Sequence, residues 1–145
     1  MKKTLLILIA IVIVIVCIIG IKYYSYMMEY NNVIKENEEY EKYKDQEVYG
    51  IDLATLINKA VDKNEKNNIP KDDKNLYIQN DENSIEIEIY IEDNETTYKM
   101  EVFYNSGTEQ FIQYYGNIKF KCSKIEYHEK TGKIKYILFE QIQTS

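Results

Sequence analysis

SIEIEIYIEDNETTYKMEVFY, residues 84–104, decides the fold of the downstream part of this chain. Isoleucine fills alternate positions at the start of the stretch, glutamate or tyrosine stands between them, and a second alternating run follows a polar interval. Alternation with a period of two is typical of a strand that buries one face, so the two runs predict a β-hairpin.

The register of this hairpin follows from the need to keep its isoleucines on one buried face. A turn at residues 93–94 pairs Ile89 with Tyr98, and it places Glu88 opposite Lys99 on the solvent side. The same register predicts two further pairs on the buried face: Ile87 with Met100, and Ile85 with Val102.

A second hairpin is predicted from residues 117–128 and 133–142. The letters EKTG join the two runs, and Gly132 suits the left-handed position of a turn followed by a bulge. The apolar positions change parity in the middle of the first run, which predicts a β-bulge near Ser123.

One helix is expected to pack on these strands. Residues 53–61 carry apolar side chains at helical spacing, Asp52 precedes them as an N-cap, and Pro70 bars continuation. A short strand at 76–79 and one or two helical turns at 108–116 complete the pattern. We therefore expect an α+β fold, with one helix on a four- or five-stranded antiparallel sheet made of two hairpins.

The opposite end of the chain predicts a membrane anchor. Leu5–Ile21 is a run of 17 residues without a charge, and a helix is the form in which such a segment satisfies its backbone in lipid. Tyr23 and Tyr24 follow at the position of an interfacial belt. We expect a cytoplasmic tail at 1–3 and a transmembrane signal anchor at 4–21.

Two other fates of this run stay open. Cleavage after Gly20 or Ser25 lacks the small residues that signal peptidase prefers, and lipidation of Cys17 lacks a small residue before it. Lys2 and Lys3 precede the run, whereas Lys22 is the only lysine in the next 13 residues. This bias favours a cytoplasmic N-terminus and an extracytoplasmic C-terminal domain at the cell membrane, in a single pass.

Tyrosine and aliphatic residues then recur at spacings of three and four among charged residues in 22–47. This predicts a helical stalk, followed by a single extracytoplasmic domain at 48–145. The part beyond the anchor holds 16 lysines, no arginine and all 24 acidic residues, a formal charge of −8. Such a domain repels nucleic acid and anionic lipid headgroups, so protein partners are expected instead.

No residue pattern predicts a catalytic, cofactor or metal site. Cys122 and His128 lie six residues apart on one predicted strand, about 20 Å if extended, too far to share a substrate atom or an ion. Acidic residues cluster in 81–95 but lack the spacing of a calcium loop, and alternating carboxylates point to solvent together. A buried structural role is expected for Cys122, which has no partner for a disulfide outside the anchor.

The order of an apolar N-terminal helix, an amphipathic stalk and an antiparallel sheet resembles the layout of pilins and pseudopilins. That resemblance implies assembly of subunits, but the peptidase site and the early glutamate of that family have no counterpart at 1–21. The stretches YGIDLATLINKAVDKNEKN (49–67) and YHEKTGKIKYILFE (127–140) are similar to those of small single-pass proteins of A and T-rich Gram-positive bacteria, a resemblance that implies no activity.

The expected function is therefore that of a non-enzymatic, membrane-anchored extracytoplasmic binding or envelope-assembly subunit, for example of a secretion, pilus-like or transfer apparatus. A stand-alone surface sensor or ligand-binding module is the alternative, and a carboxylate-based surface hydrolase is a weaker one.

Overall fold

The computed structural model describes residues 2–143, which divide into two compact units that meet between Lys35 and Glu36. Helix α1 (Lys2–Glu41) runs through the first unit, and its last two turns belong to the second. The apolar run is helical throughout, as the sequence predicts. Its side chains from Leu5 to Ile21 are exposed, and the helix is long and apolar enough to span a membrane.

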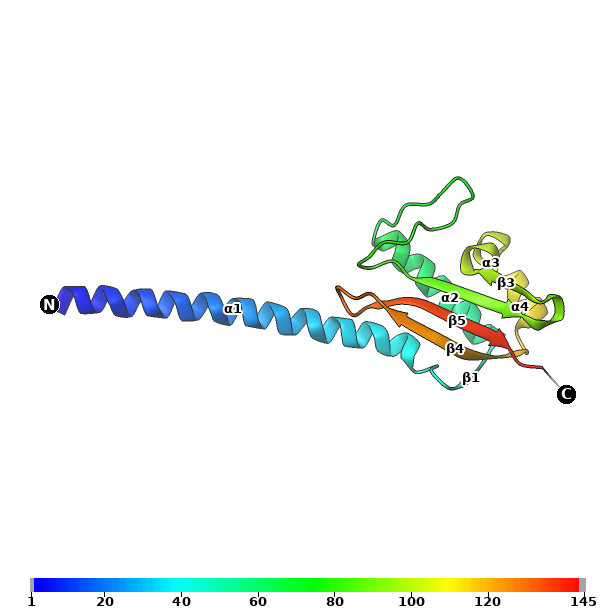
Figure 1. Cartoon of the computed structure of the whole chain (residues 1–145), viewed down its shortest axis with the longest axis horizontal. Coiled ribbons are helices and arrows are strands. Elements are labelled where there is room, and N and C mark those ends of the chain that lie inside the picture. Colours follow the sequence, from blue (N-terminus) through cyan, green and yellow to red (C-terminus); the bar gives the residue numbers. More distant parts are fainter. Residues whose placement is uncertain (1, 144–145) are drawn as a thin grey trace. The chain divides into compact units, whose positions relative to one another are not determined.

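The second unit is built around a five-stranded mixed sheet in the order β1-β4-β5-β2-β3. The strands are β1 (Glu47–Tyr49), β2 (Glu86–Ile91), β3 (Thr96–Lys99), β4 (Lys119–Tyr127) and β5 (Ile134–Gln141). Helices α2 (Gly50–Lys66), α3 (Met100–Ser106) and α4 (Thr108–Tyr115) lie on one side of this sheet (Figure 1). The α+β class is confirmed.

The expectation of a purely antiparallel sheet is wrong in one place, because β2 and β5 pair in parallel. The other three pairings are antiparallel. After β3 the chain forms α3 and α4. It then re-enters the sheet on the β2 side of the first hairpin, and no strand is added next to β3. β5 then fits between β4 and β2, running with β2.

The first hairpin follows the predicted register only near its turn. Ile89 pairs with Tyr98 and Glu88 pairs with Lys99, as predicted. The pairs of Ile87 with Met100 and of Ile85 with Val102 are wrong, since α3 begins at Met100. Met100 and Phe103 are both buried at helical spacing, which a period of two cannot achieve. Val102 is exposed instead.

The second hairpin forms as predicted. β4 and β5 pair antiparallel, and their register shifts between Cys122 and Lys124, which confirms the bulge. Gly132 has a φ of 68°, the left-handed conformation expected in this turn.

Helix α2 buries the predicted stripe, but it begins at Gly50 instead of after Asp52. Gly50 is required there because a Cβ atom would stand 2.0 Å from the carbonyl oxygen of Tyr115. The predicted strand at 76–79 is absent, and only an isolated bridge joins Lys71 to Tyr77. The connection from α2 to β2 is held by side chains, not by a strand ladder.

The last turns of α1 enter the core of the second unit. Tyr40 is 3% exposed and Asn37 is 8% exposed. The helix ends at Glu41, and the chain turns into β1, where the sequence analysis expected a stalk to residue 47. The compact unit thus begins upstream of residue 48, the expected start of the extracytoplasmic domain.

Candidate functional site

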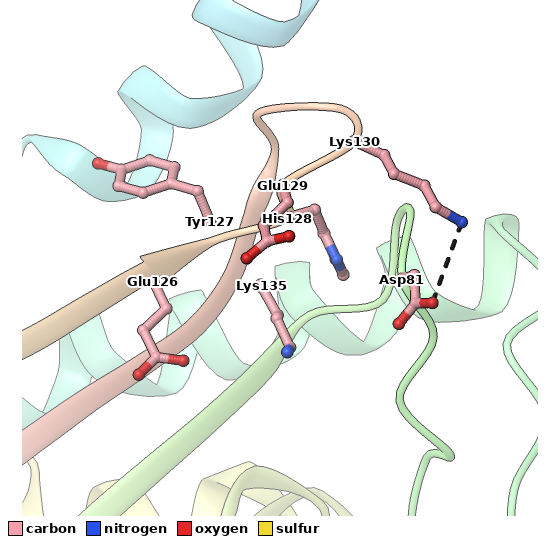
Figure 2. Close-up of a pocket in the computed structure, with 7 residues that line it drawn as sticks. All are labelled: Asp81, Glu126, Tyr127, His128, Glu129, Lys130 and Lys135. Carbon is pink, nitrogen blue, oxygen red and sulfur yellow. Dashed lines mark ion pairs between the residues drawn. The ribbon is translucent and has the colours of Figure 1, made fainter.

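A hollow of about 670 Å³ lies where β4 ends and turns into β5 (Figure 2). Its lining residues come from β4, the turn, β5 and the loop before β2: Asp81, Glu126, Tyr127, His128, Glu129, Lys130 and Lys135. We call it the turn hollow. It mixes three carboxylates with two lysines, so it has no dominant charge.

The rim of the turn hollow is fixed by contacts between the β4–β5 turn and the loop before β2. The Thr131 hydroxyl donates to the Glu82 carbonyl oxygen at 2.7 Å, and Lys130 lies 3.9 Å from Asp81, the ion pair drawn in Figure 2. Within the turn, the Gly132 N–H donates to the His128 carbonyl oxygen at 2.8 Å. The hollow is therefore a product of how two loops are tied together.

His128 has a structural role in this arrangement. Its side chain is 2% exposed, and its Nε2 lies 2.8 Å from the Ser84 carbonyl oxygen. A carbonyl only accepts, so Nε2 carries the hydrogen and is committed to this bond. A histidine held in this way secures the start of β2 and is poorly placed to exchange protons with a ligand through Nε2.

Cys122 is also committed to a main-chain partner. It is 4% exposed, and its Sγ lies 3.8 Å from the carbonyl oxygen of Lys124, across the bulge. Burial raises the pKa of the Cys122 thiol, which disfavours the reactive thiolate. Cys122 and His128 thus each bond to a different carbonyl, and nothing joins them into a nucleophilic pair.

The acidic residues of 81–95 are mostly engaged singly. Glu86 forms an ion pair with Lys99, and Glu88 accepts a hydrogen bond from the Tyr136 hydroxyl at 2.7 Å. Glu92 accepts from the Gln143 amide at 2.7 Å. Among residues 2–143, no three His, Cys, Asp or Glu side chains are placed to hold a metal ion.

A second set of polar contacts binds the end of α1 to its surroundings, and we call residues 36–41 the α1 clasp. The Asn37 side chain donates to the Gly132 carbonyl oxygen at 2.8 Å and accepts from the Ile134 N–H at 3.0 Å. The Tyr127 hydroxyl donates to Glu41 at 2.6 Å. The α1 clasp is therefore hydrogen-bonded to the β4–β5 turn, which also forms the rim of the turn hollow.

Ion pairs also connect the α1 clasp to lysines of α2 and of the β4–β5 turn. Glu36 forms ion pairs with Lys63 and, at 3.7 Å, with Lys133, while Glu39 lies 3.3 Å from Lys59. Burial, and then the charge of Lys133, lower the pKa of Lys63 to about 8. The Lys63 side chain is 18% exposed, the least of these three lysines.

The sequence analysis did not identify Asn37 as a contact residue. A signal was present, because Asn37 interrupts the apolar stripe of the stalk on a helix face that is buried at Asn37 and Tyr40. A polar side chain on such a face is buried only if its amide groups find hydrogen-bond partners, which the turn supplies here.

Comparison of the chain with protein-family models, with curated proteins and with solved structures found no significant match. The sequence and the structure are therefore the basis for any functional proposal. The turn hollow has an exposed ion pair between Lys130 and Asp81 at its rim, while His128 and Cys122 each contact a main-chain carbonyl oxygen.

Proposed function

We propose that this protein is a membrane-anchored extracytoplasmic subunit whose α+β head binds a protein partner in an envelope assembly, such as a secretion, pilus-like or transfer apparatus, and that it is not an enzyme. The observation that carries the proposal is the exposed apolar run of α1, Leu5–Ile21. An uncovered surface of this size is unfavourable in water, and a bilayer is the environment that covers it.

Orientation is proposed from charge. Lys2 and Lys3 precede the apolar run, while Lys22 follows it alone, so the N-terminus is assigned to the cytoplasm and the head to the outside. The absence of arginine and the negative charge of the head support a protein partner over nucleic acid or anionic lipid.

The experiment is a topology measurement in intact cells with a permeable wall. In a chain carrying Cys17→Ser and Cys122→Ser, a cysteine placed by Lys130→Cys should react with a membrane-impermeant maleimide before lysis. The matched control, Lys3→Cys, should react only after lysis. The reverse pattern would place the head in the cytoplasm, and reaction of both sites in a soluble fraction would remove the anchor altogether.

A stand-alone ligand-binding module is the second candidate, and the turn hollow is what favours it. Genes for a secretion ATPase and a polytopic platform protein beside this gene would favour assembly. If deletion of those neighbours leaves the anchored protein at its normal level and position, the stand-alone module becomes the better description.

A further inference from the structure

The part of α1 that follows the apolar run has two unlike sides. Four of the chain's 15 tyrosines fall within residues 23–30, and Glu29 is the single charge between Lys22 and Lys35. An α-helix has about 3.6 residues per turn, so positions three and four apart share a side. One side, which we call the tyrosine side, carries Tyr23, Tyr26, Met27 and Tyr30. The opposite side, which we call the polar side, carries Lys22, Ser25, Glu29 and Asn32.

The tyrosine side is exposed. Tyr23, Tyr26 and Tyr30 are 66%, 65% and 53% exposed, and Met28 at its border is 50% exposed. A contiguous apolar surface of this kind is unfavourable in water. It continues the exposed run Leu5–Ile21 on the same helix without a break, so the medium that covers the run is the nearest one that can cover the tyrosine side.

The length of the apolar run indicates that this medium extends past Ile21. Leu5–Ile21 has 17 residues, which at about 1.5 Å per residue span about 25 Å, less than the roughly 30 Å of the hydrocarbon core of a bilayer. Residues 23–28 add six positions without a charge, and Lys22 can extend its ammonium group to water along its aliphatic stem. A crossing from Leu5 to Met28 spans about 36 Å, enough for the core and part of the interface.

We propose that the tyrosine side lies in the lipid interface that follows the apolar run, while the polar side of the same helical turns faces water. Tyrosine suits this position because its ring is apolar and its hydroxyl can hydrogen-bond to water or to lipid carbonyl groups. Met27 and Met28 bring flexible apolar side chains to the same level. The inference rests on the proposed anchored subunit and names the part of the bilayer that its juxtamembrane helix contacts.

A tilted helix accounts for the two sides. Transmembrane helices are tilted by about 20° on average, and interfacial side chains set the direction of the tilt. A tilt toward the tyrosine side brings Tyr30 down to the lipid and lifts Glu29, on the polar side, into water. An upright helix would treat both side chains alike, although one is apolar and the other is charged.

The chemistry of the segment favours neutral lipid over other occupants. Lys22 is the single cation of residues 22–34, so an anionic headgroup finds no basic cluster to bind. Close packing of a second membrane helix favours small residues at the contact, whereas the tyrosine side carries three tyrosines and a methionine. The contact is therefore assigned to the boundary between acyl chains and headgroups of zwitterionic lipid.

The test uses tryptophan fluorescence, because the chain has no tryptophan of its own. Full-length variants with one tryptophan each are placed in phosphatidylcholine vesicles. Bromine atoms on the acyl chains quench a tryptophan that touches lipid, and iodide present on both sides of the membrane quenches one in water. Tyr30→Trp and Asn32→Trp are the matched pair, since the two positions lie about 3 Å apart along the helix but about 160° apart around it.

Brominated lipid should quench Tyr30→Trp several-fold more than Asn32→Trp, and iodide should give the reverse order. Iodide quenching of both variants would place the segment in water, and equal quenching of both by lipid would remove the distinction between the sides. Protection of Tyr30→Trp from both quenchers would mean that a second helix covers it. Each of these three results overturns the proposal. Anionic phosphatidylglycerol should not be needed, and an order that appears only in its presence also overturns the proposal.

A pair of charge insertions tests the same assignment in the Tyr30→Trp chain. Met27→Lys places a cation on the tyrosine side, so the segment should move toward water and the reporter should become more sensitive to iodide and less sensitive to lipid. Ser25→Lys places the same charge on the polar side and should leave the reporter unchanged. Equal effects of the two substitutions contradict the sided contact.

Two reference sites distinguish failure of this inference from failure of the anchor. Val12→Trp, in the middle of the apolar run, should be quenched by brominated lipid alone, and Tyr114→Trp, 66% exposed on α4, by iodide alone. If lipid does not quench Val12→Trp, the anchor itself fails, and the proposed function and this inference fail with it. If Val12→Trp behaves as expected while Tyr30→Trp follows Asn32→Trp, the lipid contact of the tyrosine side is overturned and the proposed function stands.

Discussion

The side-chain amide of Asn64 hydrogen-bonds both main-chain groups of Ile85. Its Nδ2 donates to the Ile85 carbonyl oxygen at 2.7 Å, and its Oδ1 accepts from the Ile85 N–H at 2.8 Å. Both residues are buried. A helix side chain thus supplies the partner that a neighbouring strand would give, at the point where the chain enters β2.

Replacing Asn64 by alanine should therefore be costly. It leaves a buried N–H and a buried carbonyl without partners, and we expect a loss of about 2–4 kcal/mol in the free energy of unfolding, measured by denaturant titration in detergent. Asn58→Ala, on the same helix, removes one 3.3 Å bond to Thr108 and should cost less than about 1 kcal/mol. Similar losses in both variants would contradict the role given to Asn64.

The two faces of β2 should respond differently to substitution. Ile87 is fully buried, so Ile87→Asp places an unpaired carboxylate in the core and should cost several kcal/mol, close to the whole stability of a small domain. Glu88→Ala removes one hydrogen bond, from the Tyr136 hydroxyl, on the other face of β2 and should cost only about 1 kcal/mol. Thermal unfolding monitored by circular dichroism measures both, and comparable shifts would mean that the assigned burial is wrong.

Substitution of Gly50 and of Gly132 by alanine should destabilise the fold by different amounts, for different physical reasons. Gly50→Ala places a Cβ 2.0 Å from a backbone oxygen of Tyr115, so α2 and α4 must move apart, and we expect a loss above about 3 kcal/mol. Gly132 has open space around it but a φ of 68°, so Gly132→Ala should cost only about 1 kcal/mol. An equal or reversed order in denaturant titrations would show that the close approach at Gly50 relaxes freely.

The α1 clasp should be part of the folded unit. A fragment of residues 36–143 keeps buried Tyr40 and the two hydrogen bonds of Asn37, whereas a fragment of 48–143 loses them. We expect the longer fragment to be more stable by several kcal/mol. Asn37→Ala in the longer fragment should remove part of that advantage in the free energy of unfolding. Two fragments with the same melting temperature would support residue 48 as the start of the folded domain.

Stability should fall at alkaline pH because of buried tyrosines. Burial, with a contribution from Glu39, raises the pKa of Tyr40 above its usual range. Folded chains keep this proton while unfolded chains release it from about pH 10, so the stabilisation is complete below pH 10 and is lost as pH rises further. Unfolding titrations at pH 8 to 11 should show a shallower decline for Tyr40→Phe. Tyr114→Phe, at an exposed site, should leave the decline unchanged.

Local periodicity predicted most of the strands and the main helix because each of these elements has one buried face. The stripe of α2, the alternation of β2 and the parity change at Ser123 all report burial directly. Met100 shows the limit of this reasoning. It continues the alternation of Tyr98, yet it starts a helix, since the buried position of Phe103 is three residues on and not two.

Pairing between distant segments was not available from periodicity. The parallel pairing of β2 with β5 and the place of Val48 in an edge strand have no signature in the local sequence. Both depend on where the chain re-enters the sheet after its helices. The partners of the polar side chains in the site were equally hidden. His128 and Asn37 are bound to main-chain groups, and sequence does not show which carbonyl lies nearby.

The position of β5 in the middle of the sheet has a kinetic consequence. It is the last of the five described strands in sequence, yet it joins β4 to β2. Until Gln141 has left the ribosome or the translocation channel, the segments of β1 and β4 have no strand connecting them to those of β2 and β3. The sheet can then close only after β5 has been made, and slowly, because its pairings close long loops. For the export that we propose, this delay is useful, because a sheet that closes late does not obstruct the passage of its own chain.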